Sequence, residues 1–401
     1  MSLQKIHKTI SQKLVNGGGL HLYHIIVGSL LVVFILFSVF VDYQNNKKTE
    51  ELRSAAAQMR TEQVAVLEKL ESDHIAVATV KSQFLPGIVC WGDSLTAGAG
   101  GNGTTYPKVL EELIAENITS LYDPARNLES QYKYLAKSDD YSISIPVYNM
   151  GVGGESTNTI LGRNGAIPFV LSSVVSIPSD KIAVQIELVS KNGSDVAPLI
   201  QGKAGMDWVE ISDVRGVISY NEDNKAYYFT RETAGDAVSA PAGTEVITQG
   251  SQNYRDLVTV IFMGTNDYNI TSYQLIEKIN SMLAHQTSNK DRFIIVGLHA
   301  VDYAGADINS RRALEAGLKE AYGDKFINLR EYMAKSGMKD AELTPTETDL
   351  QMMTEGSTPK SLLNDEVHFN STGYTLLGNL VYERMEELGY FNEIKSVMGL
   401  K

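Results

Sequence analysis

Cysteine is almost absent from this sequence. Cys90 is the single cysteine among 401 residues, so no disulfide can form within the chain. Its apolar neighbours favour a small buried side chain at that position. No group of cysteines and histidines has the spacing of a zinc site. Acidic residues outnumber basic ones, which gives a formal net charge of −13. Nucleic-acid binding needs a basic surface, so this charge argues against that function.

One long apolar run stands near the N-terminus. The run from Ile25 to Val41 predicts a membrane-spanning helix over residues 20–42. Lysines at positions 5, 8 and 13 precede it, which favours a cytoplasmic tail at 1–19 and an extracytoplasmic location for the rest of the chain. A cleaved signal peptide is the alternative. No A-x-A-like cleavage site follows the run, so we favour an uncleaved signal-anchor.

Residues 43–83 are predicted to form a helical stalk. The segment 44–80 is polar and alanine-rich and has neither proline nor glycine. A weak heptad pattern runs through it, at alternating spacings of four and three. Its positions are Leu52, Ala56, Met59, Gln63, Val66 and Leu70, and the alanine and glutamine weaken the pattern. Two interpretations remain open. One is a solvated helix, and the other is a coiled coil that joins two copies into a homodimer.

From about residue 84 the pattern changes to apolar strands that alternate with amphipathic helices. This alternation is typical of a parallel sheet covered by helices on both faces. We predict one α/β domain made of residues 84–167 and 255–401. Its expected strands are 87–91, 145–151, 257–264, 292–298 and 325–329, and its clearest helices are 272–285, 310–322 and 371–388.

Residues 168–254 break this alternation. Short strand-like runs follow one another there, separated by turn signals such as 191–194, 221–224 and 241–243. This pattern predicts an all-β module inserted into the α/β domain. The sequence leaves its role open between a carbohydrate-binding wall, an oligomer contact and a spacer.

Glycines and polar side chains follow the first three expected strands. Gly92-Asp93-Ser94 follows the first, the run 149–155 (NMGVGGE) the second, and 264–267 (GTND) the third. Ligands of an open parallel sheet bind beyond the carboxyl ends of its strands. A hydroxyl, glycine amides and a side-chain amide are the groups that acyl transfer needs. Taken alone, Ser94 has two interpretations, a nucleophile or the N-cap of the next helix.

A nucleophilic serine needs a base, and only a few of the seven histidines lie in the α/β domain. His285 falls late in an amphipathic helix. His299 ends the fourth strand, where it is either a substrate contact or a buried structural histidine. His368 precedes the last helix and lies three residues after Asp365. An aspartate at that spacing can turn its carboxylate back onto the imidazole, as the third member of a catalytic triad does.

Together these residues resemble the SGNH, or GDSL, hydrolases in four ordered blocks. The sequence reads GDSL at 92–95, N-x-G-x-x-G at 149–154, G-x-N-D at 264–267 and D-x-x-H at 365–368. The resemblance covers about residues 85–390 apart from the insertion. It implies a flavodoxin-like three-layer α/β/α fold with a parallel sheet of order 2-1-3-4-5.

The resemblance also implies a chemistry. Ser94 would attack an ester, His368 would take its proton, and Asp365 would orient His368. The Ser94 amide, the Gly154 amide and the Asn266 side chain would form the oxyanion hole. No metal or organic cofactor is implied.

An acylated small molecule or glycan is the expected substrate, including O-acetylated polysaccharide of the cell wall or the environment. Short-chain lipids are the alternative substrate. Two alternatives stay open from the sequence. One is an O-acyltransferase with the same triad, and the other is a wall-binding protein with a vestigial site.

Overall fold

The computed structural model describes residues 87–118 and 145–397, together with isolated residues between 25 and 61. The chain divides into two compact units, Met1–Val80 and Lys81–Lys401. Within the described residues, no helix has the length and hydropathy of a membrane span. The predicted span at 20–42 and the stalk at 43–83 lie outside the described residues except for isolated positions. Both therefore stay predictions.

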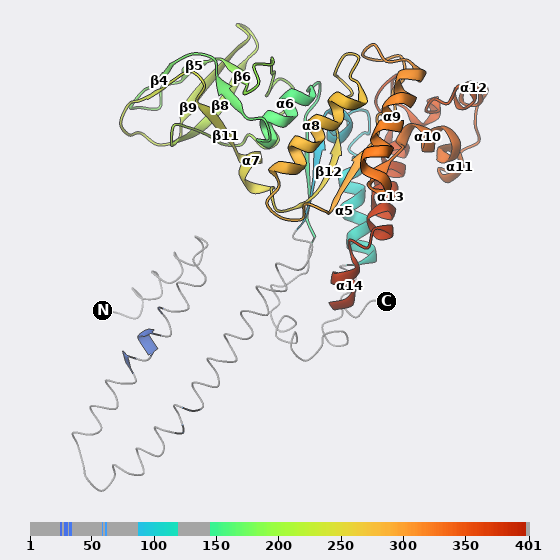
Figure 1. The fold of residues 1–401 in the computed structure, drawn as a ribbon, viewed down its shortest axis with the longest axis horizontal. Coiled ribbons are helices and arrows are strands. Elements are labelled where there is room, and N and C mark those ends of the chain that lie inside the picture. Colours follow the sequence, from blue (N-terminus) through green and yellow to red (C-terminus); the bar gives the residue numbers. More distant parts are fainter. Residues whose placement is uncertain are drawn as a thin grey trace. The chain divides into compact units, whose positions relative to one another are not determined.

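A five-stranded sheet forms the centre of the second unit (Figure 1). All its neighbouring strands are parallel, in the order β14-β13-β12-β1-β2. This confirms the predicted order 2-1-3-4-5. The central strands β1 and β12 are buried along their whole length, as strands covered on both faces must be. The strands are β1 (Ile88–Gly92), β2 (Val147–Gly151), β12 (Val258–Phe262), β13 (Phe293–Val296) and β14 (Phe326–Ile327).

Helices in two groups cover this sheet. Helix α5 (Tyr106–Asn117) packs on α13 (Ser371–Glu387), and α8 (Ser272–His285) packs on both α6 (Thr157–Asn164) and α9 (Ile308–Tyr322). Capping boxes begin α8 and α9, at Thr271 and Asp307, and fix where each helix starts. Further helices are α4 (Ser94–Ala97), α7 (Gln249–Asn253), α10 (Leu329–Tyr332), α11 (Met338–Asp340), α12 (Glu347–Glu355) and α14 (Asn392–Val397). A short π-helix spans Met333–Gly337, and 3-10 helices span Gly323–Lys325 and Lys360–Leu362.

The insertion is an antiparallel β module with its own hydrophobic core. Seven strands pair in the order β5-β9-β8-β7-β11-β3-β6, and β10 pairs with β4. Three strands, β3, β4 and β10, lie outside the strand-like runs that the sequence predicted. The strands are β3 (Phe169–Leu171), β4 (Val175–Ile177), β5 (Val184–Ile186), β6 (Leu188–Ser190), β7 (Val209–Ile211), β8 (Val214–Asn221), β9 (Ala226–Arg231), β10 (Val238–Ala240) and β11 (Glu245–Thr248).

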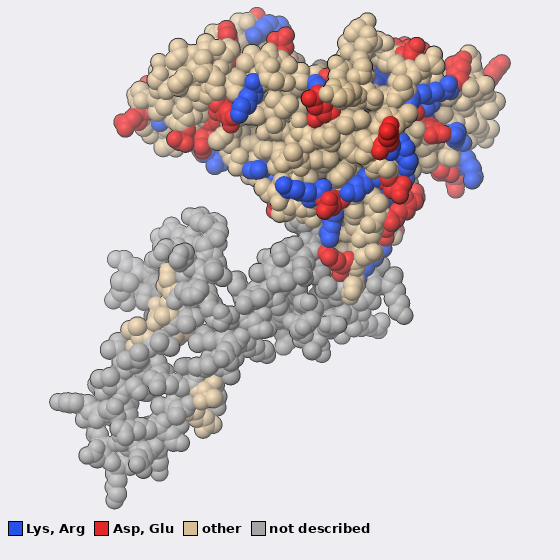
Figure 2. Space-filling view, viewed as in Figure 1, with Lys and Arg blue, Asp and Glu red and all other residues tan. Residues whose placement is uncertain are grey.

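Charged side chains lie mainly on the outside. Figure 2 shows acidic and basic residues interspersed over the visible face of the second unit. Their ion pairs are mostly exposed; Lys319 and Asp324, for example, are 58% and 88% exposed and 3.2 Å apart. Exposed pairs of this kind contribute about 0–1 kcal/mol each. The free energy of folding therefore comes mainly from the buried strands and helices.

Candidate active site

The turn after β1 presents Ser94. The N-cap of the short helix α4 is Asp93, whose carboxylate accepts the N–H of Leu95 at 3.0 Å. Ser94 is the first residue of the helix, so its hydroxyl does not serve as the cap. Burial raises the pKa of Asp93 to about 6, although the hydrogen bond from Leu95 opposes that rise. Asp93 is thus a structural residue, and Ser94 is left available for another partner.

A second loop brings Asp365 and His368 to this turn. It is closed by a bridge between Leu363 and Phe369 and by a bond from the N–H of Asn364 to the carbonyl of His368, at 2.8 Å. Asn370 then caps α13 by accepting the N–H of Gly373. The loop is therefore held at both ends by hydrogen bonds within the α/β domain.

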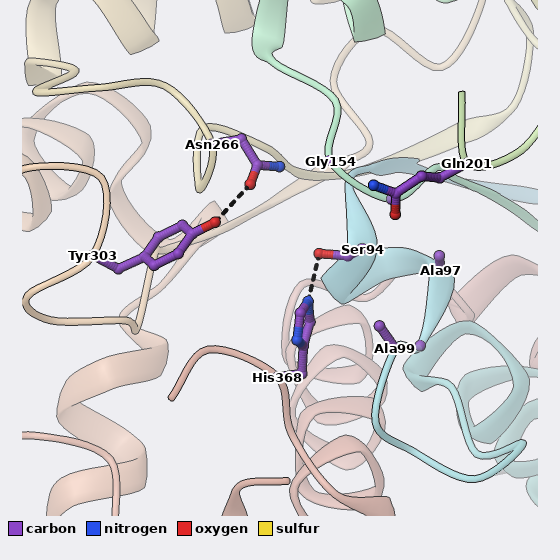
Figure 3. A pocket seen from close by; sticks show the side chains of 10 residues that line it. Ser94, Ala97, Ala99, Gly154, Gln201, Asn266, Tyr303 and His368 are labelled. Atoms are coloured by element: carbon purple, nitrogen blue, oxygen red, sulfur yellow. Dashed lines mark hydrogen bonds between the residues drawn. The ribbon is translucent and has the colours of Figure 1, made fainter. Parts of the chain in front are cut away.

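The three side chains form a chain of hydrogen bonds. The Nε2 atom of His368 lies 2.8 Å from the Oγ atom of Ser94, and its Nδ1 atom lies 2.8 Å from Oδ2 of Asp365 (Figure 3). Burial acts to raise the pKa of Asp365. The hydrogen bonds from His368 and Val367 outweigh it and hold the pKa well below its usual range. A carboxylate that stays ionised favours a proton on Nδ1, which leaves Nε2 free to accept the serine proton.

His299 lies beside this loop and outside the pocket. Its side chain is buried, stacks on Phe369 with ring centroids 4.1 Å apart, and lies 3.3 Å from the hydroxyl of Thr358. Burial lowers its pKa to about 3. This position does not support the predicted substrate contact. The structure instead agrees with the other interpretation of His299, a buried histidine that supports the loop of His368.

Donors for an oxyanion converge on the same spot. Gly154 has a φ of 70°, a conformation that favours glycine. The backbone N–H groups of Ser94 and Gly154 have no acceptor among the described residues. Asn266 donates from Nδ2 to the carbonyl of Glu155 at 3.0 Å and accepts from the hydroxyl of Tyr303 at 3.3 Å. Both bonds fix the orientation of the Asn266 amide, whose second N–H remains available.

These groups line one pocket of about 440 Å³. Its walls contain no lysine, arginine, aspartate or glutamate, and no leucine, isoleucine, valine or phenylalanine. A neutral wall offers no partner for a charged substrate group, and the lack of large aliphatic side chains offers no apolar channel for a long acyl chain. The lining residues are Ser94, Ala97, Gly98, Ala99, Gly153, Gly154, Gln201, Asn266, Tyr303 and His368.

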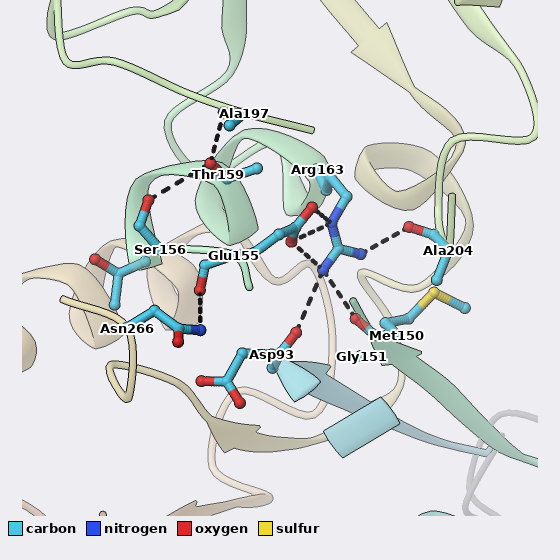
Figure 4. A network of polar contacts seen from close by, with 12 residues as sticks. Asp93, Met150, Gly151, Glu155, Ser156, Thr159, Arg163, Ala197, Ala204 and Asn266 are labelled. Atoms are coloured by element: carbon cyan, nitrogen blue, oxygen red, sulfur yellow. Dashed lines mark hydrogen bonds and ion pairs between the residues drawn. The ribbon is translucent and has the colours of Figure 1, made fainter. Parts of the chain in front are cut away.

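A buried ion pair lies beneath the site (Figure 4). Arg163 of α6 and Glu155 lie 2.7 Å apart, with side chains 0% and 2% exposed. Arg163 also donates to the carbonyls of Met150 at 3.0 Å and Ala204 at 2.7 Å, and lies 3.4 Å from that of Gly92. One guanidinium therefore joins the ends of β1 and β2 to the inserted module.

Sequence reasoning missed Arg163, Tyr303 and Gln201. Arg163 lies on a helix whose sequence does not distinguish a buried cation from an exposed one. Tyr303 follows His299 in a loop without a block motif, and Gln201 lies in the insertion, whose chemistry was unreadable. The adjacency of Glu155 to Gly154 was the one available signal, because an acid beside an oxyanion glycine needs a partner.

The sequence and the fold were compared with those of known proteins. The family model described as GDSL-like Lipase/Acylhydrolase matches residues 88–381. No curated protein matches the chain. A solved structure entitled "Peptidoglycan O-acetylesterase in action, 5 min" is 11% identical, covers 78% of this chain and 93% of its own, and superposes with a TM-score of 0.30. That TM-score is too low to support an inference about the substrate.

Proposed function

This chain belongs to the GDSL-like lipase/acylhydrolase family, and from that premise we propose that it cleaves carboxylic esters with Ser94 as the nucleophile. The observation that supports this most directly is the chain of 2.8 Å contacts from Ser94 through His368 to Asp365. A nucleophile within hydrogen-bond reach of a base, with the base oriented by a third group, is the arrangement that activates a serine hydroxyl.

The reaction proceeds in two stages. Ser94 Oγ attacks the carbonyl carbon while His368 Nε2 takes its proton. The imidazolium then returns that proton to the departing alkoxide, which leaves as the alcohol, and the acyl group remains on Ser94. Water, deprotonated by His368, attacks the acyl-enzyme, and the carboxylic acid departs as the proton returns to Ser94. The N–H groups of Ser94, Gly154 and Asn266 stabilise the oxyanion of both stages.

The neutral pocket supports a substrate with a short acyl group and an uncharged alcohol. An acetyl group needs no apolar channel, and the hydroxyls of a sugar need no charged partner. O-acetyl groups on a cell-wall or environmental polysaccharide fit both conditions. Esters of long fatty acids fit the acyl side poorly, because the wall has no large aliphatic side chain.

The proposal includes a location outside the cytoplasmic membrane, with the apolar run at 20–42 as the anchor. In cells that express the full chain, the enzyme should stay with the membrane after carbonate washing. External protease should cleave it in spheroplasts. Release by carbonate, or full protection from protease, would contradict this part.

The catalytic part is tested with the purified full-length chain. Hydrolysis of 4-nitrophenyl acetate should exceed that of the octanoate, and Ser94→Ala should lose roughly 10⁴–10⁶-fold in kcat. Circular dichroism serves as the folding control for the variant. Equal turnover by the variant and the natural chain would show that Ser94 is not the nucleophile.

A further inference from the structure

We propose that Gln201 binds the alcohol part of the substrate, so that the inserted module selects esters of hydroxyl-bearing alcohols such as sugars. This inference rests on the proposed esterase function and names a substrate class for it. Gln201 is the one residue of the insertion that lines the pocket of Ser94.

The carboxamide of Gln201 lies directly against the oxyanion turn. A β-carbon placed on Gly153 would be 2.5 Å from Gln201 Oε1, and one placed on Gly154 would be 2.9 Å from Nε2. A side chain at either glycine would therefore displace the carboxamide from its place against the turn. Figure 3 shows the carboxamide on the opposite side of Ser94 from Tyr303, so the two side chains form facing walls.

The loop that carries Gln201 is anchored on both sides of it. Before Gln201, the N–H of Ala197 donates to Thr159 of α6 at 3.0 Å, and Tyr227 of β9 donates to the carbonyl of Pro198 at 2.9 Å. After Gln201, the carbonyl of Ala204 accepts from Arg163 at 2.7 Å. The position of Gln201 over the pocket is thus set by both the hydrolase domain and the module, as a preorganised contact requires.

The chemistry of the side chain indicates the ligand. Gln201 is exposed, and its carboxamide makes no hydrogen bond with the described residues. It therefore offers two N–H donors and a carbonyl acceptor, none of them charged. A ligand with hydroxyl or amide groups can accept from the N–H groups and donate to the carbonyl, whereas a carboxylate or phosphate would use the N–H donors alone. An ester that has free hydroxyls beside the acyl group, as in a partly acetylated glycan, is the matching class.

Two acetyl esters that differ only in the alcohol test this inference. The full-length chain and Gln201→Ala are compared on 4-nitrophenyl acetate, whose alcohol has no hydroxyl to bind, and on a partly O-acetylated N-acetylglucosamine oligomer. Loss of hydrogen bonds to a neutral ligand should lower kcat/KM on the oligomer by about tenfold. The rate on 4-nitrophenyl acetate should fall by a smaller factor, so the ratio of the two kcat/KM values should shift toward the aryl ester. The matched control is Gln185→Ala, an exposed glutamine of β5 in the same module and outside the pocket.

A charge at the same position provides a second measurement. Gln201→Glu keeps the size of the side chain and places an anion beside the Gly154 amide, where it opposes the developing oxyanion. Both esters should then be hydrolysed more slowly. If both variants leave the ratio of the two kcat/KM values unchanged, the inference about Gln201 is wrong while the esterase function stands. The inference about Gln201 is also wrong if the natural chain hydrolyses 4-nitrophenyl acetate but not the acetylated oligomer. If the natural chain hydrolyses neither ester any faster than Ser94→Ala, the proposed function itself fails.

Discussion

Two pairs of a carboxylate and a basic side chain lie near the Ser94 turn, and they differ in their exposure to solvent and in their other partners. Asp365 and His368 are 48% and 27% exposed, and each can exchange protons with water. Glu155 and Arg163 are 2% and 0% exposed, and the guanidinium bonds backbone carbonyls as well as its carboxylate. In the proposed reaction the exposed pair moves a proton, whereas the buried pair holds the backbone around the Ser94 turn.

Substitutions in the two pairs should therefore affect different properties, activity in one case and stability in the other. Loss of a member of the exposed pair should reduce activity with little effect on folding, because water can solvate the remaining partner. Loss of a member of the buried pair should reduce stability first, because it leaves an uncompensated buried charge. The largest expected effect is therefore on kcat, and the next largest is on the free energy of unfolding.

Asp365→Asn should lower kcat by about 10⁴-fold, because the amide no longer holds a proton on Nδ1 of His368. The unfolding free energy should change by less than about 1 kcal/mol, since the site is half exposed. Steady-state kinetics and urea unfolding measure both quantities. Glu366→Gln removes a charge at the next residue and serves as the control. If kcat of Asp365→Asn falls by less than a factor of ten, Asp365 and His368 do not transfer the proton.

Arg163→Met should lower the unfolding free energy by about 3–5 kcal/mol, because Glu155 is left buried without a cation. Replacing Glu155 as well, in the double variant with Glu155→Met, should recover part of this loss. Lys319→Met removes one partner of an exposed pair and should cost at most about 1 kcal/mol. Urea unfolding compares the three proteins. If the double variant is less stable than Arg163→Met, the loss of stability does not come from an unpaired Glu155 carboxylate.

Asp93 is a third carboxyl at the turn, and burial raises its pKa to about 6 from 3.8. Because the folded state holds the proton more tightly than the unfolded state, this group lowers stability as the pH rises from about 4 to 6, by roughly 3 kcal/mol in all. Asp93→Asn does not titrate. Its stability relative to the natural chain should rise by about that amount between pH 4 and pH 7, measured by denaturant unfolding at each pH. A constant difference would show that Asp93 has no raised pKa.

Tyr303→Phe should have the smallest effect, a loss of about two- to tenfold in kcat. It removes the hydroxyl that holds the Asn266 amide at 3.3 Å, which is one neutral hydrogen bond. Tyr268→Phe, at a tyrosine that is 77% exposed, is the control and should have no effect. Equal kcat in all three proteins would indicate that the hydrogen bond from Asn266 to the carbonyl of Glu155 is sufficient to orient the Asn266 amide.

The same contrast explains what could be predicted from the sequence. The five strands followed from apolar runs that alternate with helices, and their order followed from the resemblance to the SGNH hydrolases. Ser94, Asp365 and His368 were placed by blocks whose residues lie at strand ends or before a helix. The structure brings Ser94 and Asp365 each to 2.8 Å from a ring nitrogen of His368. Local pattern was sufficient for these because each lies next to an element that the pattern predicts.

The rest depends on contacts between segments distant in the chain. Arg163 meets Glu155, Met150 and Ala204 only after the sheet and the insertion have folded. Gln201 reaches the pocket because its loop is bonded to α6, which no short motif records. His299 shows the limit in the other direction, because a histidine at a strand end lies either in a site or beneath it, and packing on Phe369 decides which.

The central claim is that Ser94 forms the acyl-enzyme. The most direct measurement treats the full-length chain with a fluorophosphonate and maps the adduct by peptide mass spectrometry. The predicted result is a single adduct on the peptide that contains Ser94, abolished in Ser94→Ala and strongly slowed in Asp365→Asn. An adduct on another residue, or labelling that persists in Ser94→Ala, would contradict the claim.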